Sequence, residues 1–356
     1  MDIPERLLGQ LNGEEGPTRQ KAARLVLDLA ETAKADGFVE AVHAHVSGVS
    51  VITGGHGLRQ LLADLSESSD GRVSIPTTLN SAGCDHEKMD EMDIAWPNFL
   101  EQQFEIIQAY EELGIQATLS CTPYDRGVDD GSGIASWAES NAVCFSNTWT
   151  SLITNRESGL SALATALTGY APRWGLHLPE HRMPNMLVHV EAKLSDLSDW
   201  SVLGDWIGKQ VRPEWDMPFG PMPLVTGLPS FISFASKKAL TAAAANYGCA
   251  LLWADGHSAD PPLSRTEDGW AAPESGWQGA LTFTEKDLGK RYDELAPTGQ
   301  VDLVVIGCPQ ASLEEIRTTA SAVRSHMEMG KRIPDHRLWV FTSGENYELA
   351  RADGSL

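Results

Sequence analysis

The chain alternates between segments of helical and strand-like apolar periodicity. Residues 18–36 repeat apolar side chains at helical spacing, and the apolar stretch 38–46 that follows is predicted to be a strand. The same alternation predicts helices at 58–66, 99–113, 138–145, 161–168, 237–247 and 313–327, and extended segments at 73–78, 115–120, 187–192, 249–253, 301–306 and 338–342. Helices alternating with strands indicate an α/β fold in which loops gather at one edge of a sheet.

Two of the predicted strands lead into similar corners in which a cysteine stands close before a proline. Cys121 is separated from Pro123 by one threonine, and Cys308 is followed directly by Pro309. Proline has no N–H donor and a fixed φ, so it ends a strand and leaves the thiol on a rigid corner. Thiolate is the ligand that iron–sulfur clusters and zinc prefer, so these corners could hold a soft metal. A small buried hydrophobe is the alternative for each cysteine.

The remaining cysteines do not complete a familiar metal or disulfide pattern. Cys144 and Cys249 have apolar neighbours typical of a core, whereas Cys84 lies in a polar turn. An odd number of widely spaced cysteines argues against a disulfide framework, and the absence of a CxxC pair argues against a zinc knuckle. Ligands for a metal would therefore have to converge from distant parts of the sequence.

Charge and composition narrow the class of protein. The 356 residues suit two or three α/β layers, and 27 basic against 49 acidic residues give a net charge of −22. Such a surface repels nucleic acid and anionic lipid, so neither is expected as a partner. A small anionic substrate would need local cations or helix N-termini. The beginning of the chain lacks the pattern of a signal peptide, and no apolar run is long enough to span a membrane, which predicts a cytoplasmic protein.

Three polar groupings are candidates for binding or chemistry. The small residues from Gly48 onward allow backbone N–H groups to approach a ligand, although a plain glycine turn is the alternative. The run 155–157 places an amide, a cation and a carboxylate in one predicted loop, where a solvated loop is the alternative. His43 and His45 share one face of a strand, and we expect one to be in the core and the other at the surface.

Several short segments together resemble the aconitase X family. They follow one another in the family's order across residues 40–345, which is far more specific than any single motif. The segments are 43–50, 76–80, 120–124, 138–143, 154–157, 161–163, 169–172, 175–178 and 307–309. The resemblance implies an aconitase-like α/β fold, with several three-layer α/β/α domains around a central cluster site.

The resemblance also implies a domain organisation and partners. Residues 1–356 are similar to the catalytic region of the family's large subunit, with two or three α/β subdomains and the C-terminal part missing. The small swivelling domain that completes the family's active site is absent from this sequence. It is expected as a separate subunit, which would make the protein a heterodimer.

The known activities of the family are hydro-lyase reactions. The segment 45–50 resembles the branch that dehydrates (R)-5-phosphomevalonate to trans-anhydromevalonate 5-phosphate, a step of the mevalonate pathway of isoprenoid biosynthesis. Dehydration of cis-3-hydroxy-L-proline or another hydroxy acid is one alternative, and a cluster-free, non-catalytic subunit is another.

The resemblance implies that one group of residues contacts the substrate, namely Gly48, Val49, Ser50, Asn80 and Ser81.

The residue types themselves suggest further roles. Asn155, Arg156 and Glu157 are the candidate catalytic residues, and Asn155, Arg156 and Lys237 are candidates for holding substrate anions.

The family's cofactor is a [4Fe-4S] cluster held by three cysteines, with one iron open to the substrate hydroxyl. Cys121 and Cys308 match two of the ligands, but the Asp-Thr-Cys motif that carries the third, and a nearby family lysine, do not occur in this sequence. The sequence is truncated, or another group such as Cys84 substitutes, or this member has lost the cluster. Two further departures are Gln310 in place of a usual histidine and residues 132–134 in place of Gly-Glu-His. In the family mechanism the open iron acts as a Lewis acid, and a base expected from the small subunit removes the proton next to the carboxylate.

Overall fold

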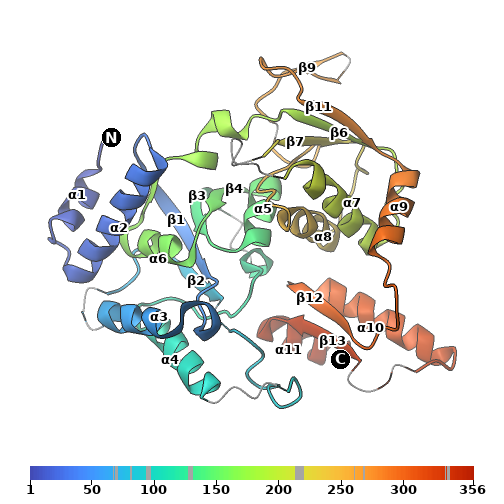
Figure 1. Cartoon of the computed structure of the whole chain (residues 1–356), viewed down its shortest axis with the longest axis horizontal. Coiled ribbons are helices and arrows are strands. Elements are labelled where there is room, and N and C mark those ends of the chain that lie inside the picture. The colour runs from blue at the N-terminus through green and yellow to red at the C-terminus, as the bar shows by residue number, and fades with distance from the viewer. Residues whose placement is uncertain are drawn as a thin grey trace. The chain divides into compact units, whose positions relative to one another are not determined.

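The computed structural model describes residues 1–66, 68, 71–80, 82–93, 98–126, 131–212, 220–259, 261–267, 269–332, 334 and 337–356 (Figure 1). Contacts between residues divide the chain into two units. Unit 1 comprises Met1–Leu119 and Asp129–Arg182, and unit 2 comprises Ser120–Val128 and Met183–Leu356. The short segment that carries Cys121 therefore belongs to unit 2, although the sequence on either side of it belongs to unit 1.

Unit 1 is built on a parallel sheet whose strands end at a common edge. The parallel strands have the order β2-β1-β3-β4, and β5 runs antiparallel to the start of β1. Ser47 pairs with Asn80 and Trp137 pairs with Arg156, so the last residues of neighbouring strands stand side by side. The strands are β1 (Phe38–Ser47), β2 (Thr77–Asn80), β3 (Ser132–Trp137), β4 (Ser151–Arg156) and β5 (Tyr170–Pro172).

The helices of unit 1 bury apolar faces against this sheet and against one another. Val46 of β1 belongs to a core shared with Leu62, Tyr110 and Leu167 of three different helices. Figure 1 shows α6 along β1, which it contacts together with α2. The helices are α1 (Glu5–Leu11), α2 (Pro17–Ala33), α3 (Val51–Ser66), α4 (Phe99–Glu112), α5 (Ser140–Trp149) and α6 (Gly159–Thr168), followed by the 3₁₀ turns η2 (Gly175–His177) and η3 (Pro179–Arg182).

Unit 2 contains a second parallel sheet, a separate pair of parallel strands and a short antiparallel hairpin. The larger sheet has the order β11-β6-β7-β8, β12 pairs with β13, and β9 pairs with β10. These strands are β6 (Met186–Val190), β7 (Pro223–Thr226), β8 (Trp253–Ala254), β9 (Arg265–Thr266), β10 (Gly269–Trp270), β11 (Gly279–Phe283), β12 (Val304–Ala311) and β13 (Leu338–Thr342).

The helices of unit 2 cover these strands, and one pair approaches closely. A Cβ atom at Gly204 would lie 2.1 Å from the carbonyl oxygen of Leu240, so only glycine lets α7 pack this tightly on α8. Helix α10 begins with a capping box between Ser312 and Glu315. The helical segments are η1 (Pro123–Arg126), α7 (Leu197–Gln210), α8 (Phe234–Ala245), α9 (Glu285–Leu295), α10 (Leu313–Glu328) and α11 (Gly344–Ala352).

The predicted α/β fold is confirmed, but three local predictions are wrong. Residues 115–120 do not form a strand. They pair with β2 through an isolated bridge at Gln116 and a backbone hydrogen bond from Leu119 to the carbonyl of Leu79, and φ of Leu119 is a left-handed 49°. The predicted strand 249–253 shortens to β8. Asn155 and Arg156 lie at the end of β4 and not in a loop.

In the described part of the chain, no helix combines the length and apolar character needed to cross a membrane.

Replacing Leu62 by alanine should destabilise unit 1 substantially. Leu62 is 0% exposed in the core, so Leu62→Ala should lower the free energy of unfolding by ~2–5 kcal/mol. Ile52 lies on the same helix but is 57% exposed, so Ile52→Ala should change it by less than ~0.5–1 kcal/mol. Denaturant unfolding measures both values, and equal effects would contradict the assigned core.

Candidate functional site

The carboxyl edge of the unit 1 sheet gathers polar side chains from three strands. The Ser47 hydroxyl donates a hydrogen bond of 2.8 Å to Oε2 of Glu139, and Nδ2 of Asn80 donates one of 3.3 Å to the same oxygen. Glu139 follows β3 closely and so joins the ends of β1 and β2. Ligands of parallel α/β sheets bind beyond the carboxyl ends of the strands, which makes this edge a candidate substrate site. Glu139 lies in the segment 138–143 that resembles the family, but its residue type and position in the sequence indicate no role.

The predicted substrate loop follows β1 at this edge. Gly48 adopts a left-handed φ of 71°, whereas the Val49 side chain is buried in the core and leaves only its backbone to meet a ligand. The N–H of Ser50 donates to Oγ1 of Thr53 at 2.9 Å, which fixes the loop at the start of α3. Substrate binding by this loop and by Asn80 stays a prediction, and Ser81 lies outside the described residues.

Gly159 holds the first turn of α6 against this loop. A Cβ atom at Gly159 would lie 2.3 Å from Cγ1 of Val49 and 2.6 Å from the carbonyl oxygen of Ser47. The loop 47–49 can therefore keep its position only if residue 159 has no side chain.

Asn155 is buried at the end of β4, and its amide holds a neighbouring segment of unit 1. Its Oδ1 accepts a hydrogen bond of 2.7 Å from the N–H of Leu176, and its Nδ2 donates one of 3.1 Å to the carbonyl of Trp174. These contacts make Asn155 an anchor for residues 174–176, and a direct catalytic role stays a prediction.

Arg156 and Glu157 differ sharply in environment although they are adjacent. Arg156 is exposed, and its side chain makes no hydrogen bond or ion pair within the described residues, so its guanidinium is available for an anion. Oε2 of Glu157 accepts a hydrogen bond of 2.6 Å from Ser161, while Oε1 is buried without a partner in the described part of the chain. Burial raises the pKa of Glu157, which favours a protonated carboxyl that can transfer a proton.

Both histidines of β1 are buried, so the expectation that one lies at the surface is wrong. Nδ1 of His43 accepts a hydrogen bond of 3.0 Å from the indole of Trp137, and Nδ1 of His45 lies 2.8 Å from Oγ1 of Thr78. Burial lowers the pKa of His43 to about 4 and that of His45 to about 3. Both rings are therefore neutral at ordinary pH and belong to the packing of the sheet.

In unit 2 the two cysteine segments lie beside each other. The N–H of Gln310 donates a hydrogen bond of 3.1 Å to Sγ of Cys121, and the N–H of Cys121 donates one of 3.3 Å to Oε1 of Gln310. Cys308 lies two residues before Gln310 and is exposed. The prediction that each cysteine stands at the exit of a strand is wrong. Cys121 follows no strand, and Cys308 lies within β12 where the pairing with β13 is irregular.

A buried lysine lies behind this pair of segments. Lys238 of α8 is 1% exposed, donates a hydrogen bond to the carbonyl of Gln310 and places Nζ 2.5 Å from Oε2 of Glu315. Its neighbour Lys237 was the predicted binding residue, because helical periodicity does not show which of two adjacent lysines turns inward. Lys237 is half-buried, and its role in substrate binding stays a prediction.

Asp125 adds a second carboxyl to the same region of unit 2. The hydroxyl of Thr122 donates a hydrogen bond of 2.9 Å to Oδ2 of Asp125, while Oδ1 is buried with no partner in the described part of the chain. Burial raises the pKa of Asp125 to about 6, against the opposing effect of the nearby Lys238 charge.

The role of Cys121 and Cys308 as ligands of a three-cysteine metal site stays a prediction. Within the described residues no three His, Cys, Asp or Glu side chains are grouped so that they could hold a metal. Cys84 packs against the core of unit 1, where burial raises the pKa of its thiol and disfavours the thiolate that a metal needs. Cys144 and Cys249 are buried. If Cys121 and Cys308 are ligands, no third ligand accompanies them among the residues described.

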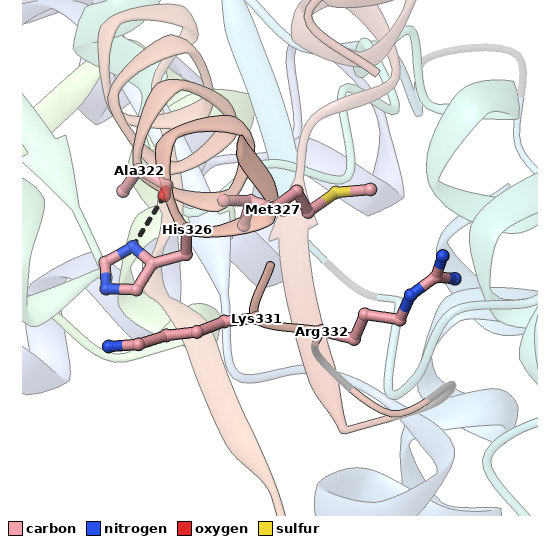
Figure 2. A pocket seen from close by; sticks show the side chains of 6 residues that line it. Ala322, His326, Met327, Lys331 and Arg332 are labelled. Atoms are coloured by element: carbon pink, nitrogen blue, oxygen red, sulfur yellow. Dashed lines mark hydrogen bonds between the residues drawn. The ribbon is translucent and has the colours of Figure 1, made fainter. Parts of the chain in front are cut away.

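A pocket at the end of α10 does not add to the site (Figure 2). It encloses about 310 Å³, and its basic side chains are His326, Lys331 and Arg332. Nδ1 of His326 bonds to the carbonyl of Ala322 at 2.8 Å, and Figure 2 shows Lys331 and Arg332 pointing in different directions. These groups do not converge on one ligand.

Replacing Gly159 by alanine should displace the loop 47–49. The new methyl group overlaps Val49 and the backbone of Ser47, so Gly159→Ala should destabilise unit 1 by ~1–3 kcal/mol. Gly57 has open space around its Cβ position, so Gly57→Ala on α3 should leave stability unchanged or raise it by up to ~1 kcal/mol. Thermal unfolding compares the two variants, and equal stability would contradict the close approach.

The free energy of unfolding should fall between pH 5 and 7 because of the titration of Asp125. Because its pKa rises from 3.8 to about 6 on folding, the folded state binds this proton more tightly than the unfolded state. The resulting stability is present at low pH and is lost as the pH rises through 6, a change of ~1 kcal/mol between pH 5 and 7. Asp125→Asn cannot titrate, so the stability difference between wild type and variant should shift by this amount. Denaturant unfolding at both pH values measures it, and a constant difference would show that Asp125 does not titrate there.

Comparisons with known proteins give the family of the chain. A family model described as the first domain of aconitase X matches residues 7–180. The phosphomevalonate dehydratase large subunit of Aeropyrum pernix is 32% identical over 342 residues, which cover 92% of this chain and 78% of that protein. The protein of the same name from Methanothermobacter thermautotrophicus is 36% identical over 336 residues, with shares of 93% and 78%. The cis-3-hydroxy-L-proline dehydratase of Pseudomonas aeruginosa is 29% identical, over 97% of this chain and 57% of that protein.

A solved structure has the same architecture. The crystal structure of the holo-form of aconitase X from Thermococcus kodakaraensis aligns with a TM-score of 0.81 and 30% sequence identity, over 100% of this chain and 84% of that one. Relatives that share about a third of their residues with this chain over most of their own length establish common descent. The chain belongs to the aconitase X family.

Proposed function

We propose that this chain is the large subunit of a phosphomevalonate dehydratase, a hydro-lyase that converts (R)-5-phosphomevalonate to trans-anhydromevalonate 5-phosphate. Several relatives with this name are 30–36% identical to it, whereas the hydroxyproline dehydratases are 28–29% identical and are matched over a smaller share of their length. The observation that carries the proposal is the pair of hydrogen bonds between Cys121 and Gln310. They bring a thiol from a distant segment to the strand of Cys308.

The proposed cofactor is a [4Fe-4S] cluster, with Cys121 and Cys308 as two of its ligands. When bound, the cluster supplies a Lewis acid that weakens the bond between the substrate carbon and its leaving hydroxyl. A third ligand would come from outside the residues described here, since Cys84 is packed into unit 1 as a thiol of raised pKa. The two thiols suit this role because thiolate is the usual ligand of iron–sulfur clusters.

The carboxyl edge of unit 1 is proposed to bind the anionic groups of the substrate. Arg156 offers an exposed guanidinium, which can form paired hydrogen bonds with a carboxylate or phosphate. A local cation matters here because the chain has a net charge of −22 and would otherwise repel an anion. The backbone of Gly48, Val49 and Ser50 and the amide of Asn80 would orient the substrate beside it, together with Ser81.

Glu157 is proposed to hold the proton that the departing hydroxyl needs. Dehydration removes a proton from the carbon next to the carboxylate, breaks the neighbouring C–O bond and forms a C=C bond, so the hydroxyl must take up a proton to leave as water. The raised pKa of Glu157 keeps its carboxyl protonated to higher pH, and its oxygen Oε1 has no partner in the described part of the chain. The base is proposed to come from the small subunit, the partner that the relatives' names imply.

Two alternatives remain as outcomes of the test. Dehydration of cis-3-hydroxy-L-proline is favoured by relatives of that name that match 97% and 90% of this chain. A cluster-free subunit is favoured by the lack of a third ligand among the described residues.

The decisive experiment measures iron and turnover in the complex of this chain with its small subunit, purified without oxygen. We expect bound iron and sulfide, turnover of phosphomevalonate and little turnover of cis-3-hydroxy-L-proline. Cys121→Ala and Cys308→Ala should each lower turnover by more than ~100-fold, since changes outside the ligand shell already cost 10–100-fold.

The matched control is Cys249→Ala, which alters a buried cysteine whose Sγ bonds to the carbonyl of Leu251. This variant should keep its iron and its turnover. Protein without iron, or ligand variants as active as wild type, would refute the cluster mechanism. If the complex turned over cis-3-hydroxy-L-proline and not phosphomevalonate, hydroxyproline would be the substrate in place of phosphomevalonate.

A further inference from the structure

Lys238 is a buried cation that none of the roles above employs. Its side chain lies on α8 and is 1% exposed. An ammonium group taken out of water is strongly destabilising unless hydrogen bonds and an opposite charge compensate it. The position of Lys238 therefore calls for a structural or functional reason.

The contacts of Lys238 lead to the backbone beside the thiols. Its ammonium group donates hydrogen bonds to the carbonyl of Gln310 and to Oε2 of Glu315, the latter at 2.5 Å. The same carboxylate oxygen accepts bonds of 2.7 Å from the N–H and 2.8 Å from the hydroxyl of Ser312, which fixes it at the start of α10. Lys238 thus ties the strand residue Gln310 to a rigid helix terminus.

Gln310 is held on both sides of its α-carbon. Lys238 binds its carbonyl, while its N–H donates a hydrogen bond of 3.1 Å to Sγ of Cys121. Its side chain accepts a further bond of 3.3 Å from the N–H of Cys121. Two hydrogen bonds, joined by the backbone of Gln310, therefore connect the buried ammonium group to the sulfur atom.

We propose that Lys238 is a positioning residue that fixes the Gln310 N–H on the sulfur of Cys121. Hydrogen bonds to ligand sulfur atoms adjust the reduction potential of iron–sulfur clusters, so Lys238 tunes the cluster without touching it. This second part rests on the proposed function, because it takes Cys121 as a cluster ligand. The positioning itself concerns the chain alone and can be tested without a cluster.

The test must remove Lys238 without leaving a buried unpaired carboxylate. The double variant Lys238→Met with Glu315→Gln removes both charges, and glutamine can keep the capping box of α10. Glu315→Gln alone is the matched control, since it retains the contact between Lys238 and Gln310. If the methionine variant does not fold, Lys238→Gln with Glu315→Gln replaces it, because the shorter amide does not span the distance to the Gln310 carbonyl.

The first readout is hydrogen–deuterium exchange of the Gln310 amide in the cluster-free chain. Pro309 has no amide proton, which isolates the Gln310 signal in short peptides. We expect exchange at least ~10-fold faster in the double variant than in Glu315→Gln, because the donor is no longer held on its acceptor. A lysine that only neutralises Glu315 would leave this rate unchanged, and that result would overturn the proposal.

The second readout is the reduction potential of the loaded complex. The double variant should bind as much iron as the control but have a lower potential, because the sulfur of Cys121 loses an N–H donor. Equal potentials would overturn the tuning role. Suppose that Gln310 exchanges faster in the double variant than in Glu315→Gln, but that the wild-type complex binds no iron. That result would refute the proposed cluster and leave the positioning role intact.

Discussion

The proposed chemistry depends on the pair of hydrogen bonds between Cys121 and Gln310. These residues are 189 positions apart, and each donates its backbone N–H to the other, one to sulfur and one to a side-chain amide oxygen. The pairing makes the segment of Cys121 part of unit 2, although the chain before and after it builds unit 1. The ion pair of Lys238 and Glu315 holds the carbonyl of Gln310. In this account the buried ion pair therefore positions Gln310 beside Cys121, besides any effect on stability.

The candidate site of unit 1 arises differently, from the parallel order of its strands. Parallel strands end at one edge, which collects Ser47, Asn80 and Arg156 from three strands. Glu139 accepts hydrogen bonds from Ser47 and Asn80. Gly159 lets the first turn of α6 pack against the loop 47–49. The polar groups are therefore positioned by a rigid sheet, while the one exposed cation among them is free to meet an anion.

The sequence was sufficient for the fold class and for the residues near the chemistry, but not for their surroundings. Apolar periodicity located α4, β1 and β13 within a residue or two. The Cys–Pro pattern selected the two cysteine segments that lie beside each other. The sequence could not show that residues 115–120 lack a strand, because the end of their pairing with β2 depends on the left-handed turn at Leu119. The prediction from the sequence named Lys237 and not Lys238, and assigned no role to Glu139. Both misses arise because tertiary packing determines which side chains are buried and which distant residues they contact.

The central claim is that Cys121 and Cys308 belong to one soft-metal site within this chain. Titration of the oxygen-free chain with Cd²⁺, followed by the ultraviolet absorption of the cadmium–thiolate bond, tests it directly. The account predicts one strongly bound ion per chain, with binding lost in Cys121→Ala and in Cys308→Ala and retained in Cys84→Ala. Binding that survives either of the first two substitutions, or that disappears with Cys84, would contradict it.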